Sequence, residues 1–499
     1  MANFGGRLWA ALLNVACIPI YVDVLGVESY GLIGFYATLQ ASLLIFDFGL
    51  STTLVREMAR LSTEAASAAN ARNTVRTLEI VYWVVGVAIA LAVAMLSAPI
   101  AHYWVHANAL SPERIQRVVA YMGITAALQW PVTLYTGGLL GLQRQVLSNV
   151  VNGAMLTVRF VGAAIAISWV DSSIESFFVS QVASVGLHVL VVAMILWRVL
   201  PKADCRATFQ PAILRHLWRF AAGMSGATVA TLAFVQIDKV FLSSWLTLRE
   251  FGFYNLAATL GAVLFIFYNP VGTAFFPPLS RFVATGRHDA LQATYRTACR
   301  LVTLPAVPTA LVMSVFAPET VFLWTRNATT TAHVAPLVSL VMLGALLGAL
   351  TYIPILTQWA YGWTSLTWRA HACAAIALVP AVLVSTAYLG PLGAMLAWVV
   401  IRLGLSLFIM ERMYSRLLRA ERIAWYRDAV FRPVAACAIT LIPARVMIDR
   451  PSSAAMSGVV LAGMWVLAVL SCSLATPALL QTLRSLLHPT DMTAPSDYA

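Results

Sequence analysis

Long apolar stretches separated by short polar ones run through almost the whole chain. A helix crosses the hydrocarbon core of a bilayer with about 20 apolar residues, and fourteen stretches come close to this length. They fall at residues 8–25, 30–55, 78–98, 118–140, 148–170, 177–197, 220–244, 252–276, 299–317, 334–360, 367–388, 392–411, 431–448 and 455–476. We therefore predict an all-α integral membrane protein with about 14 transmembrane helices. The strands of a membrane β-barrel would instead alternate polar and apolar residues.

The composition agrees with this prediction and excludes several classes of protein. Of the 499 residues, 60% are hydrophobic and only 10% are charged, against about 25% charged in an ordinary soluble protein. The connections between the apolar stretches are too short for a catalytic domain outside the membrane. The sequence has no GxxxxGK[ST], HExxH or GxSxG motif, so we do not expect an enzyme. Its six scattered cysteines form no CxxC or cysteine–histidine spacing, and we expect neither a metal site nor another cofactor.

The basic residues predict the orientation of the chain. With arginines near the span ends counted with the adjoining connection, 23 of the 32 Lys and Arg residues fall on the side that holds both termini, six on the other side and three deep within the spans. Cytoplasmic loops carry the excess of Lys and Arg, so we expect cytoplasmic N- and C-termini in a bacterial inner membrane. A soluble protein with this net charge of +12 would suggest nucleic acid binding, which we do not expect here. The apolar run after Arg7 lacks a small-residue cleavage site before Asp23, so we interpret it as the first permanent span.

Two stretches match at an offset of 221 residues. Tyr30-Gly31 is followed after five residues by Ala37-Thr38-Leu39, and Phe251-Gly252 is followed after five residues by Ala258-Thr259-Leu260. Six predicted helices separate the copies, so both would have the same orientation, as in transporters whose repeats are related by an axis along the membrane normal. Chance similarity among apolar helices is the alternative.

The repeat predicts two pseudo-symmetric six-helix lobes around a central cavity, with two extra C-terminal helices. The predicted parts are an N-lobe at 1–200, a C-lobe at 201–411, helices 13 and 14 at 412–476, and a cytoplasmic tail at 477–499.

Charged residues within the predicted spans are the candidates for function, because a charge at the bilayer centre costs at least about 2.5–3.5 kcal/mol. Arg159 and Arg402 lie about ten residues from both ends of their spans, too far for easy snorkelling. Asp47 lies within the second predicted span, and Asp238 and Lys239 are neighbours near the outer end of the seventh. Two interpretations stay open for these five residues. Either they line a central cavity that is net cationic, or each charge is neutralised by a buried partner on another helix.

Polar residues near these charges and basic residues at the span ends complete the candidate set. Gln40 and Gln236 are candidate cavity residues or interhelical hydrogen-bonding groups. Arg56, Arg60 and Arg281 lie at the predicted cytoplasmic ends of the second and eighth spans, where they form a candidate mouth. The 221-residue offset pairs Arg60 with Arg281.

Several short motifs in order resemble the Wzx-type polysaccharide flippases, in the polysaccharide-transporter branch of the multidrug/oligosaccharidyl-lipid/polysaccharide (MOP) exporter superfamily. They are Leu25-Gly26-Val27-Glu28-Ser29-Tyr30-Gly31, Asp47-Phe48-Gly49-Leu50-Ser51 with Arg56, Gly141-Leu142-Gln143-Arg144 with Asn149, Gln236-Ile237-Asp238-Lys239, Gly252-Phe253-Tyr254-Asn255 and Phe276-Pro277-Pro278-Leu279-Ser280-Arg281. The motifs cover about the first 280 residues, and the rest resembles the family by topology.

The resemblance implies translocation of undecaprenyl-diphosphate-linked oligosaccharide repeat units to the periplasmic leaflet, for O-antigen, capsule or exopolysaccharide assembly. It implies alternating access, contact with membrane lipids, and a polysaccharide polymerase and chain-length machinery as candidate partners. Arg159 and Arg402 are then candidates to hold the diphosphate, and Asp47 or Asp238 to couple transport to H⁺ or Na⁺. A lipid II-type flippase and a multidrug/cation antiporter of the same superfamily stay open as alternatives. A third alternative, from a different class, is a membrane polysaccharide polymerase or ligase.

Overall fold

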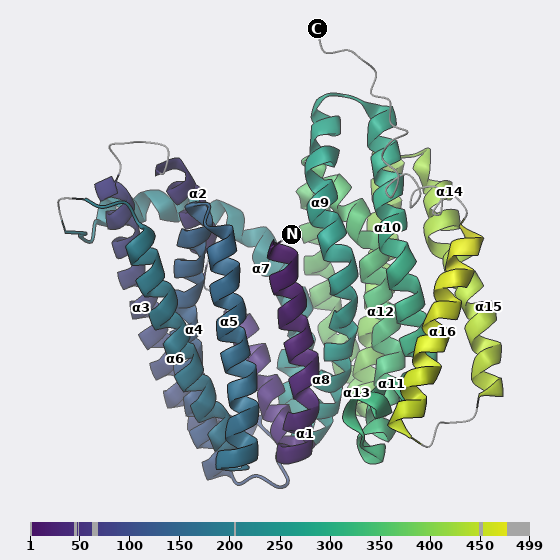
Figure 1. Ribbon diagram of the computed structural model, residues 1–499, viewed down its shortest axis with the longest axis horizontal. Helices are drawn as coiled ribbons and strands as arrows, with labels where there is room; N and C mark the ends of the chain where they lie inside the picture. The colour runs from purple at the N-terminus through teal and green to yellow at the C-terminus, as the bar shows by residue number, and fades with distance from the viewer. Residues whose placement is uncertain are drawn as a thin grey trace. The chain divides into compact units, whose positions relative to one another are not determined.

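The computed structural model describes residues 2–43, 47, 49–61, 68–203, 206–448 and 453–476. The α-helices are α1 (Ala2–Leu43), α2 (Leu50–Leu61), α3 (Ala68–Pro99), α4 (Pro112–Gly141), α5 (Gln145–Ile165), α6 (Ile174–Val199), α7 (Pro211–Trp245), α8 (Leu248–Gly261), α9 (Phe265–Ala284), α10 (His288–Val315), α11 (Ala317–Thr325), α12 (Ala328–Ala360), α13 (Thr364–Arg416), α14 (Glu421–Trp425), α15 (Arg432–Met447) and α16 (Ala454–Ala475) (Figure 1). Short π-helical or 3-10 segments lie at Ile100–Trp104, Ala166–Val170, Ala262–Leu264 and Tyr426–Phe431. The predicted all-α class is confirmed: in these ranges β-pairing is confined to one isolated bridge, between His106 and Thr247.

Eleven helices in the described ranges are long and apolar enough to cross a membrane. Helix α13 contains two predicted spans, and α1 contains the first predicted span and the beginning of the second. A glycine with positive φ kinks each helix, Gly26 at φ 78° and Gly390 at φ 56°, a conformation that glycine adopts without steric cost. The predicted span 220–244 lies on α7. Apart from the second span, the predicted spans lie almost entirely on helix, and the chain is a multi-pass membrane protein.

The second predicted span, 30–55, is wrong in one respect. It was expected to be continuous, but α1 ends at Leu43 and α2 begins at Leu50, after Gly49 at φ 73°. Asp47 therefore lies between two helices instead of inside one. Its Oδ2 accepts hydrogen bonds from the hydroxyl of Ser51 (2.8 Å) and from the backbone N–H of Ser51 (3.4 Å). These bonds satisfy a donor at the start of α2, as a capping side chain does.

The chain forms two compact units, each described here by itself. Unit 1 comprises Met1–Asn255 and His371–Val384, and unit 2 comprises Leu256–Ala370 and Ser385–Ala499. The predicted lobe boundaries at residues 200 and 411 stay predictions.

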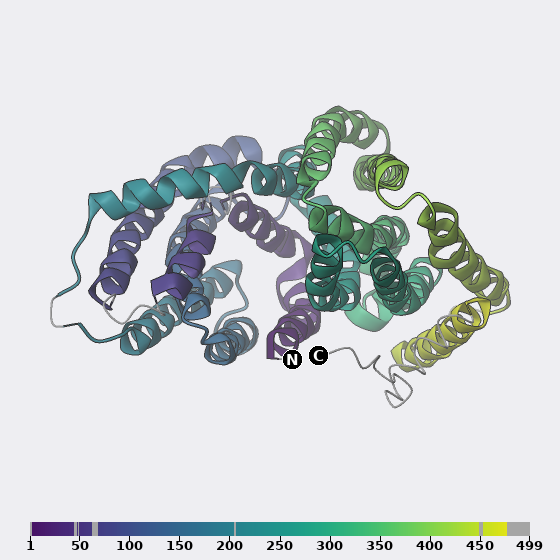
Figure 2. The ribbon, with the colours of Figure 1, turned by 90° about the horizontal axis from the view of Figure 1, so that it is seen from above.

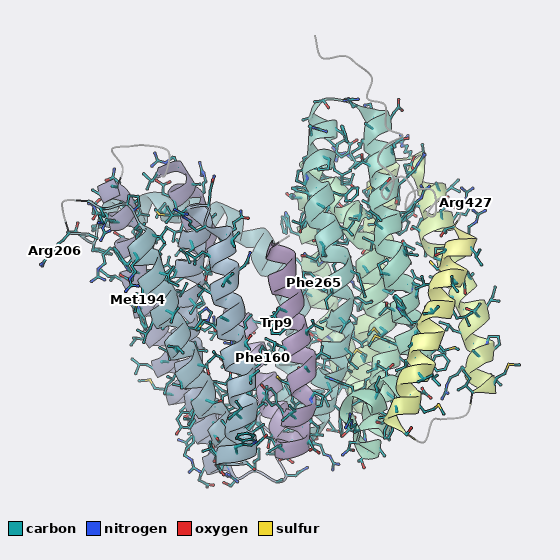
Figure 3. All side chains as sticks on the ribbon, in the orientation of Figure 1. Trp9, Phe160, Met194, Arg206, Phe265 and Arg427 are labelled. Carbon is teal, nitrogen blue, oxygen red and sulfur yellow. The ribbon has the colours of Figure 1, made fainter. Side chains whose placement is uncertain are left out.

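In unit 1, α4 packs against α3, α6 and α2, and α1 packs against α5 (Figure 1). Helix α7 contacts α1, α2 and α3 (Figure 2). Two hydrogen bonds join α1 to α5: Trp9 Nε1 donates to Thr157 Oγ1 (2.8 Å), and the Tyr21 hydroxyl donates to the carbonyl of Phe160 (2.7 Å) (Figure 3). These contacts fix α5, which carries Arg159, against the first helix.

In unit 2, α10 packs against α9, α12, α15 and α16, and α11 packs against α12 and α16. Two buried carboxylates pair with arginines across this bundle. Glu421 is 1% exposed and bonds Arg296, and Glu319 is 2% exposed and bonds Arg445 at 3.1 Å. Removal of one partner from such a pair leaves a buried charge without compensation.

Residues related by the 221-residue offset meet where α1 crosses the first turns of α8, within unit 1. A Cβ atom on Gly31 would lie 2.1 Å from the carbonyl oxygen of Leu248, and one on Gly252 would lie 2.5 Å from that of Val27. A Cβ on Gly34 would lie 2.6 Å from the side chain of Asn255, its counterpart at the same offset. Small residues allow helices to approach closely in membranes, and reciprocal contacts of this kind are what a two-fold relation between the copies produces.

Replacement of Gly31 by alanine should destabilise the protein, because the added methyl group meets backbone atoms that cannot rotate away. Overpacking of this kind costs about 1–3 kcal/mol. We expect a lower melting temperature for Gly31→Ala in detergent. Gly404→Ala is the matched control, since a Cβ there meets nothing within 4 Å. Equal melting temperatures for the two variants would contradict the close crossing.

Candidate functional site

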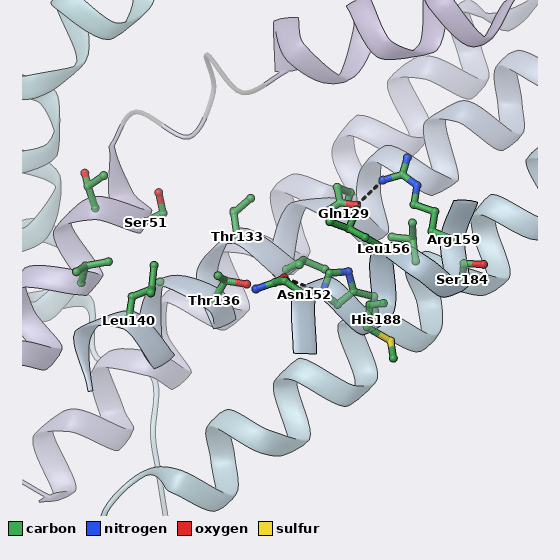
Figure 4. A pocket seen from close by; sticks show the side chains of 16 residues that line it. Ser51, Gln129, Thr133, Thr136, Leu140, Asn152, Leu156, Arg159, Ser184 and His188 are labelled. Carbon is green, nitrogen blue, oxygen red and sulfur yellow. Dashed lines mark hydrogen bonds between the residues drawn. The ribbon is translucent and has the colours of Figure 1, made fainter. Parts of the chain in front are cut away.

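A cavity of about 420 Å³ lies in unit 1 among α2, α4, α5 and α6 (Figure 4). Helical spacing explains why one side of α5 faces it: Asn152, Met155, Leu156 and Arg159 are spaced i, i+3, i+4 and i+7 and share one face. The polar residues of the lining are Ser51, Thr52, Gln129, Thr133, Thr136, Asn152, Arg159, Ser184 and His188. The cavity is therefore a polar site inside a helical bundle, the place where such bundles hold ligands.

Arg159 is held in this cavity by uncharged side chains from three other helices. Its Nε donates to Gln181 Oε1 at 2.5 Å and its Nη1 donates to Gln129 Oε1 at 3.3 Å (Figure 4). The Tyr36 hydroxyl accepts from Nη2 at 3.4 Å, and the Tyr36 ring centroid lies 5.9 Å from Cζ.

None of these contacts neutralises the guanidinium. The sequence left open whether Arg159 is paired with a buried acid, and the contacts described for it are all with Tyr36, Gln129 and Gln181. Neutral amides orient the group and satisfy part of its five donors, while its charge stays available for an anion. Arg159 is partly buried, so an anionic ligand in the cavity would interact with a charge that solvent screens only in part.

His188 lies on the same cavity, and its hydrogen bonds indicate its tautomer. Its Nε2 lies 3.1 Å from Asn152 Oδ1, while Asn152 Nδ2 donates to the carbonyl of Ser148 at 2.8 Å. Because the amide oxygen of Asn152 can only accept, His188 donates through Nε2. His188 and Asn152 thus form a hydrogen-bonded pair on the wall of the cavity that Arg159 also lines.

A second polar cluster, which the sequence analysis missed in part, ties together α2, α3, α4 and α6. Glu79 on α3 is 7% exposed. Its Oε1 accepts from the Tyr135 hydroxyl (2.7 Å) and from Trp197 Nε1 (3.1 Å), and its Oε2 pairs with Arg76 (2.7 Å). One turn further on, the Tyr82 hydroxyl donates to Asp47 Oδ1 at 2.5 Å.

This cluster holds both carboxylates away from Arg159. Asp47 is linked to the cavity only through Ser51, which lines it. Glu79 lies at the start of the predicted span 78–98. Its position three residues after Arg76 is the sequence signal by which this helical ion pair could have been predicted.

The candidates on α7 form a separate group in unit 1. Asp238 is 3% exposed; its Oδ2 accepts from the Tyr254 hydroxyl at 2.6 Å, and its Oδ1 is buried without a hydrogen-bond partner. Gln236 Oε1 is likewise buried without a partner, and Lys239 and Gln40 are partly buried. None of the four lines the Arg159 cavity. The Asp238–Tyr254 bond joins α7 to α8.

Arg402 lies on α13 in unit 2. Its Nη2 would be 2.6 Å from a Cβ on Gly348, so the missing side chain of that glycine makes room for the guanidinium against α12. Its Nε is buried without a hydrogen-bond partner. Tyr268 lies close enough to interact with it electrostatically, and the Tyr268 and Tyr352 rings are in contact at an interplanar angle of 55°, with centroids 4.7 Å apart.

The three mouth arginines are exposed. Arg56 and Arg60 lie on α2, which buries Leu54, Met58 and three further residues on its opposite face. Arg60 pairs with Glu57 at 2.5 Å, and the Arg281 guanidinium lies 5.1 Å from the Phe282 ring centroid. Their exposure suits an attraction of anions from solvent.

The structure therefore brings together only part of the predicted site. Arg159 has its own cavity, Asp47 lies at its edge, and Asp238, Lys239, Gln236 and Gln40 lie elsewhere in unit 1. Arg402 and Arg281 belong to unit 2. The glutamines that hold Arg159 were not expected to do so.

Replacement of Glu79 by alanine should be strongly destabilising, because it leaves the Tyr135 hydroxyl and Trp197 N–H buried without their acceptor. Each orphaned buried group costs about 1–3 kcal/mol. Glu57→Ala is the control, since its partner Arg60 is 55% exposed and an exposed pair contributes about 0–1 kcal/mol. Thermal unfolding in detergent measures both. A Glu79→Ala protein as stable as Glu57→Ala would exclude a structural role for this cluster.

Comparison with known proteins gives one family match. The model of a family described as "Polysaccharide biosynthesis protein" matches residues 2–283, more than half of the chain. The comparison with curated proteins returns no match.

Several solved structures share the fold. The lipid II flippase MurJ in an inward closed conformation is 11% identical, with a TM-score of 0.72 and 98% of each chain covered. An inward-facing multidrug resistance MATE family transporter of the MOP superfamily is 14% identical, with a TM-score of 0.68, covering 81% of this chain and 95% of its own. A MOP superfamily transporter from Pyrococcus furiosus, described as having a binding pocket of reverse polarity, is 14% identical, with a TM-score of 0.59. The match covers 83% of this chain and 93% of the transporter. At these identities the likeness concerns the fold.

Proposed function

The chain belongs to the polysaccharide biosynthesis protein family, and we propose that it is a flippase for undecaprenyl-diphosphate-linked oligosaccharide repeat units. It moves them from the cytoplasmic to the periplasmic leaflet of a bacterial inner membrane, for O-antigen, capsule or exopolysaccharide assembly. Both termini lie in the cytoplasm. The protein is a transporter and performs no covalent chemistry.

One observation supports this proposal most directly: the guanidinium of Arg159 lies in a membrane-embedded cavity with uncharged partners. A diphosphate cannot cross the apolar core bare, because the idealised cost of moving one ion into such a medium is of order 20 kcal/mol. A guanidinium offers paired N–H donors that match phosphate oxygens. Arg159 therefore compensates the part of the substrate that is hardest to move.

The surrounding hydroxyls and amides suit the sugars. Thr133, Thr136, Asn152 and Ser184 line the same cavity and offer both donors and acceptors. The polyprenyl chain stays in lipid, where it needs no polar path. In this proposal Arg56, Arg60 and Arg281 attract the headgroup, and Arg402 gives a second cationic position, with alternating access between the predicted lobes.

Coupling to an ion is assigned to buried carboxylates. Asp238 Oδ1 is buried without a hydrogen-bond partner, and Asp47 lies at the edge of the Arg159 cavity through Ser51. Either carboxylate is a candidate to bind H⁺ or Na⁺ during the cycle.

A lipid II-type flippase is the second candidate. The likeness to MurJ favours it, because that match extends over 98% of both chains. The match to the MATE transporter extends over 81% of the present chain. The two substrates share the carrier diphosphate in this proposal, so the Arg159 cavity suits both. A cationic cavity does not suit an exporter of cationic drugs.

Substitution of Arg159 should abolish transport without loss of the protein from the membrane. Arg159→Glu should reduce surface polysaccharide at least tenfold and accumulate lipid-linked repeat units, because a carboxylate repels the diphosphate. Arg159→Lys should retain part of the activity, since the charge persists without the fork of donors. A hydrogen bond to a charged group contributes about 1.5–3 kcal/mol, or roughly a factor of 10–100 in affinity.

The control for this experiment is Arg206→Glu, because Arg206 is exposed and lies in the connection before α7 (Figure 3). Immunoblots of the membrane fraction establish equal protein levels. Wild-type amounts of polysaccharide from Arg159→Glu would remove this residue from the transport path.

Genetic complementation separates the two flippase candidates. Expression of the chain should restore surface polysaccharide to a strain that lacks its own repeat-unit flippase. It should not restore growth to cells depleted of their lipid II flippase. Growth rescue without polysaccharide rescue would favour the lipid II alternative.

A further inference from the structure

A second cavity, of about 410 Å³, lies entirely in unit 2 and takes no part in the proposed transport path. It is formed by α10, α14, the π-helical segment Tyr426–Phe431, the start of α15 and the residue after α16. Its lining residues with polar side chains are Tyr295, Arg296, Cys299, Arg300, Glu421, Trp425, Arg427, Asp428, Arg432 and Thr476.

The cavity carries a net positive charge, since four arginines face two carboxylates. Glu421 is bound by both Arg296 Nε (2.7 Å) and Arg296 Nη2 (2.5 Å). Asp428 is shared, since it accepts two hydrogen bonds from Arg427 and one from Arg432. One carboxylate balances at most one of these two guanidinium charges, and Arg300 also lies within electrostatic reach of Asp428. The lining therefore favours an anion.

A buried donor in the lining points independently to a ligand. Trp425 is 6% exposed, and its indole Nε1 is buried without a nitrogen or oxygen hydrogen-bond partner; the thiol of Cys299, a weak acceptor, is close enough to interact with it. Tryptophan N–H groups usually find a partner when buried, and an unsatisfied donor costs about as much as a lost hydrogen bond. An oxygen acceptor bound in the cavity would satisfy it.

Large apolar side chains exposed next to these charges identify the environment as a membrane surface. Ile423 on α14 is 77% exposed and Phe431 is 65% exposed, while the Arg427 side chain between them in sequence is 55% exposed (Figure 3). Exposed apolar groups beside arginines are typical of segments at the boundary between acyl chains and headgroups. A small free anion would not cover these apolar side chains, whereas the acyl chains of a lipid would.

We propose that this cavity holds the phosphate of an anionic phospholipid, with Arg300, Arg427 and Arg432 around the headgroup and the indole N–H of Trp425 donating to an oxygen. The acyl chains lie against the exposed side chains of Ile423 and Phe431. Basic pockets between transmembrane helices bind anionic headgroups in this way. The bound lipid links α10 to α14 and α15 and stabilises unit 2, whatever the transported substrate is.

The test uses the purified, delipidated full-length protein in detergent. Its melting temperature is measured with phosphatidylglycerol, with phosphatidylcholine of the same acyl chains, and with inorganic phosphate. We expect phosphatidylglycerol to raise the melting temperature by a few degrees Celsius more than phosphatidylcholine, because a ligand that binds only the folded state stabilises it. Inorganic phosphate should have no effect.

Variants locate the effect. The double variant Arg300→Gln/Arg432→Gln should lose the difference between the two lipids. The matched control Arg412→Gln/Arg419→Gln should keep it, since these exposed arginines do not line the cavity. Trp425→Phe keeps an aromatic side chain, although a smaller one, and removes the donor, so it should reduce the difference.

Three results would each overturn the proposal: equal stabilisation by the two lipids, a lipid difference that persists in both Arg300→Gln/Arg432→Gln and Trp425→Phe, and an equal shift from inorganic phosphate. The last result would identify a free-anion site. Because the readout is stability and lipid binding, failure here leaves the proposed transport function untouched.

Discussion

The charge of Arg159, which lies within a transmembrane helix and has uncharged partners, is the constraint on which the rest of this account depends. A guanidinium within a transmembrane helix is expensive unless it is paired, hydrated or bound to a ligand. The protein gives it amide and phenol partners on three helices, which orient the group but leave its charge in place. In the proposed function, this site binds the diphosphate of the lipid-linked substrate, and the polar side chains around it contact the sugars.

The arrangement of the carboxylates in unit 1 supports the same interpretation. Glu79 is occupied by Arg76, Tyr135 and Trp197, and Asp47 is occupied by Tyr82 and the start of α2. These bonds hold the negative charges in a separate cluster, where they stabilise the packing of α2, α3, α4 and α6. The cavity thereby remains cationic, which distinguishes it physically from a pocket that selects cationic drugs.

The spans could be predicted from the sequence because apolar length is a local property, and Arg159 stood out because its span has no other charge. The partners of Arg159 could not be predicted, since Gln129 and Gln181 reach it only through the packing of α4, α5 and α6. The break after α1 was missed because the apolar run continues past Leu43, while the turn depends on the backbone of Gly49 and the capping by Asp47. The roles of Glu79 and Glu421 could not be predicted, since their partners Tyr135, Trp197 and Arg296 are distant in sequence and reach them only through helix packing.

The most direct measurement is the affinity of the purified protein in nanodiscs for undecaprenyl diphosphate, undecaprenyl monophosphate and undecaprenol. If Arg159 compensates the headgroup charge, wild-type protein binds them in that order, and Arg159→Gln binds all three with nearly equal affinity. If the variant keeps the same order of affinities and the same ratios between them as the wild type, residues other than Arg159 bind the headgroup phosphates and the central claim is wrong.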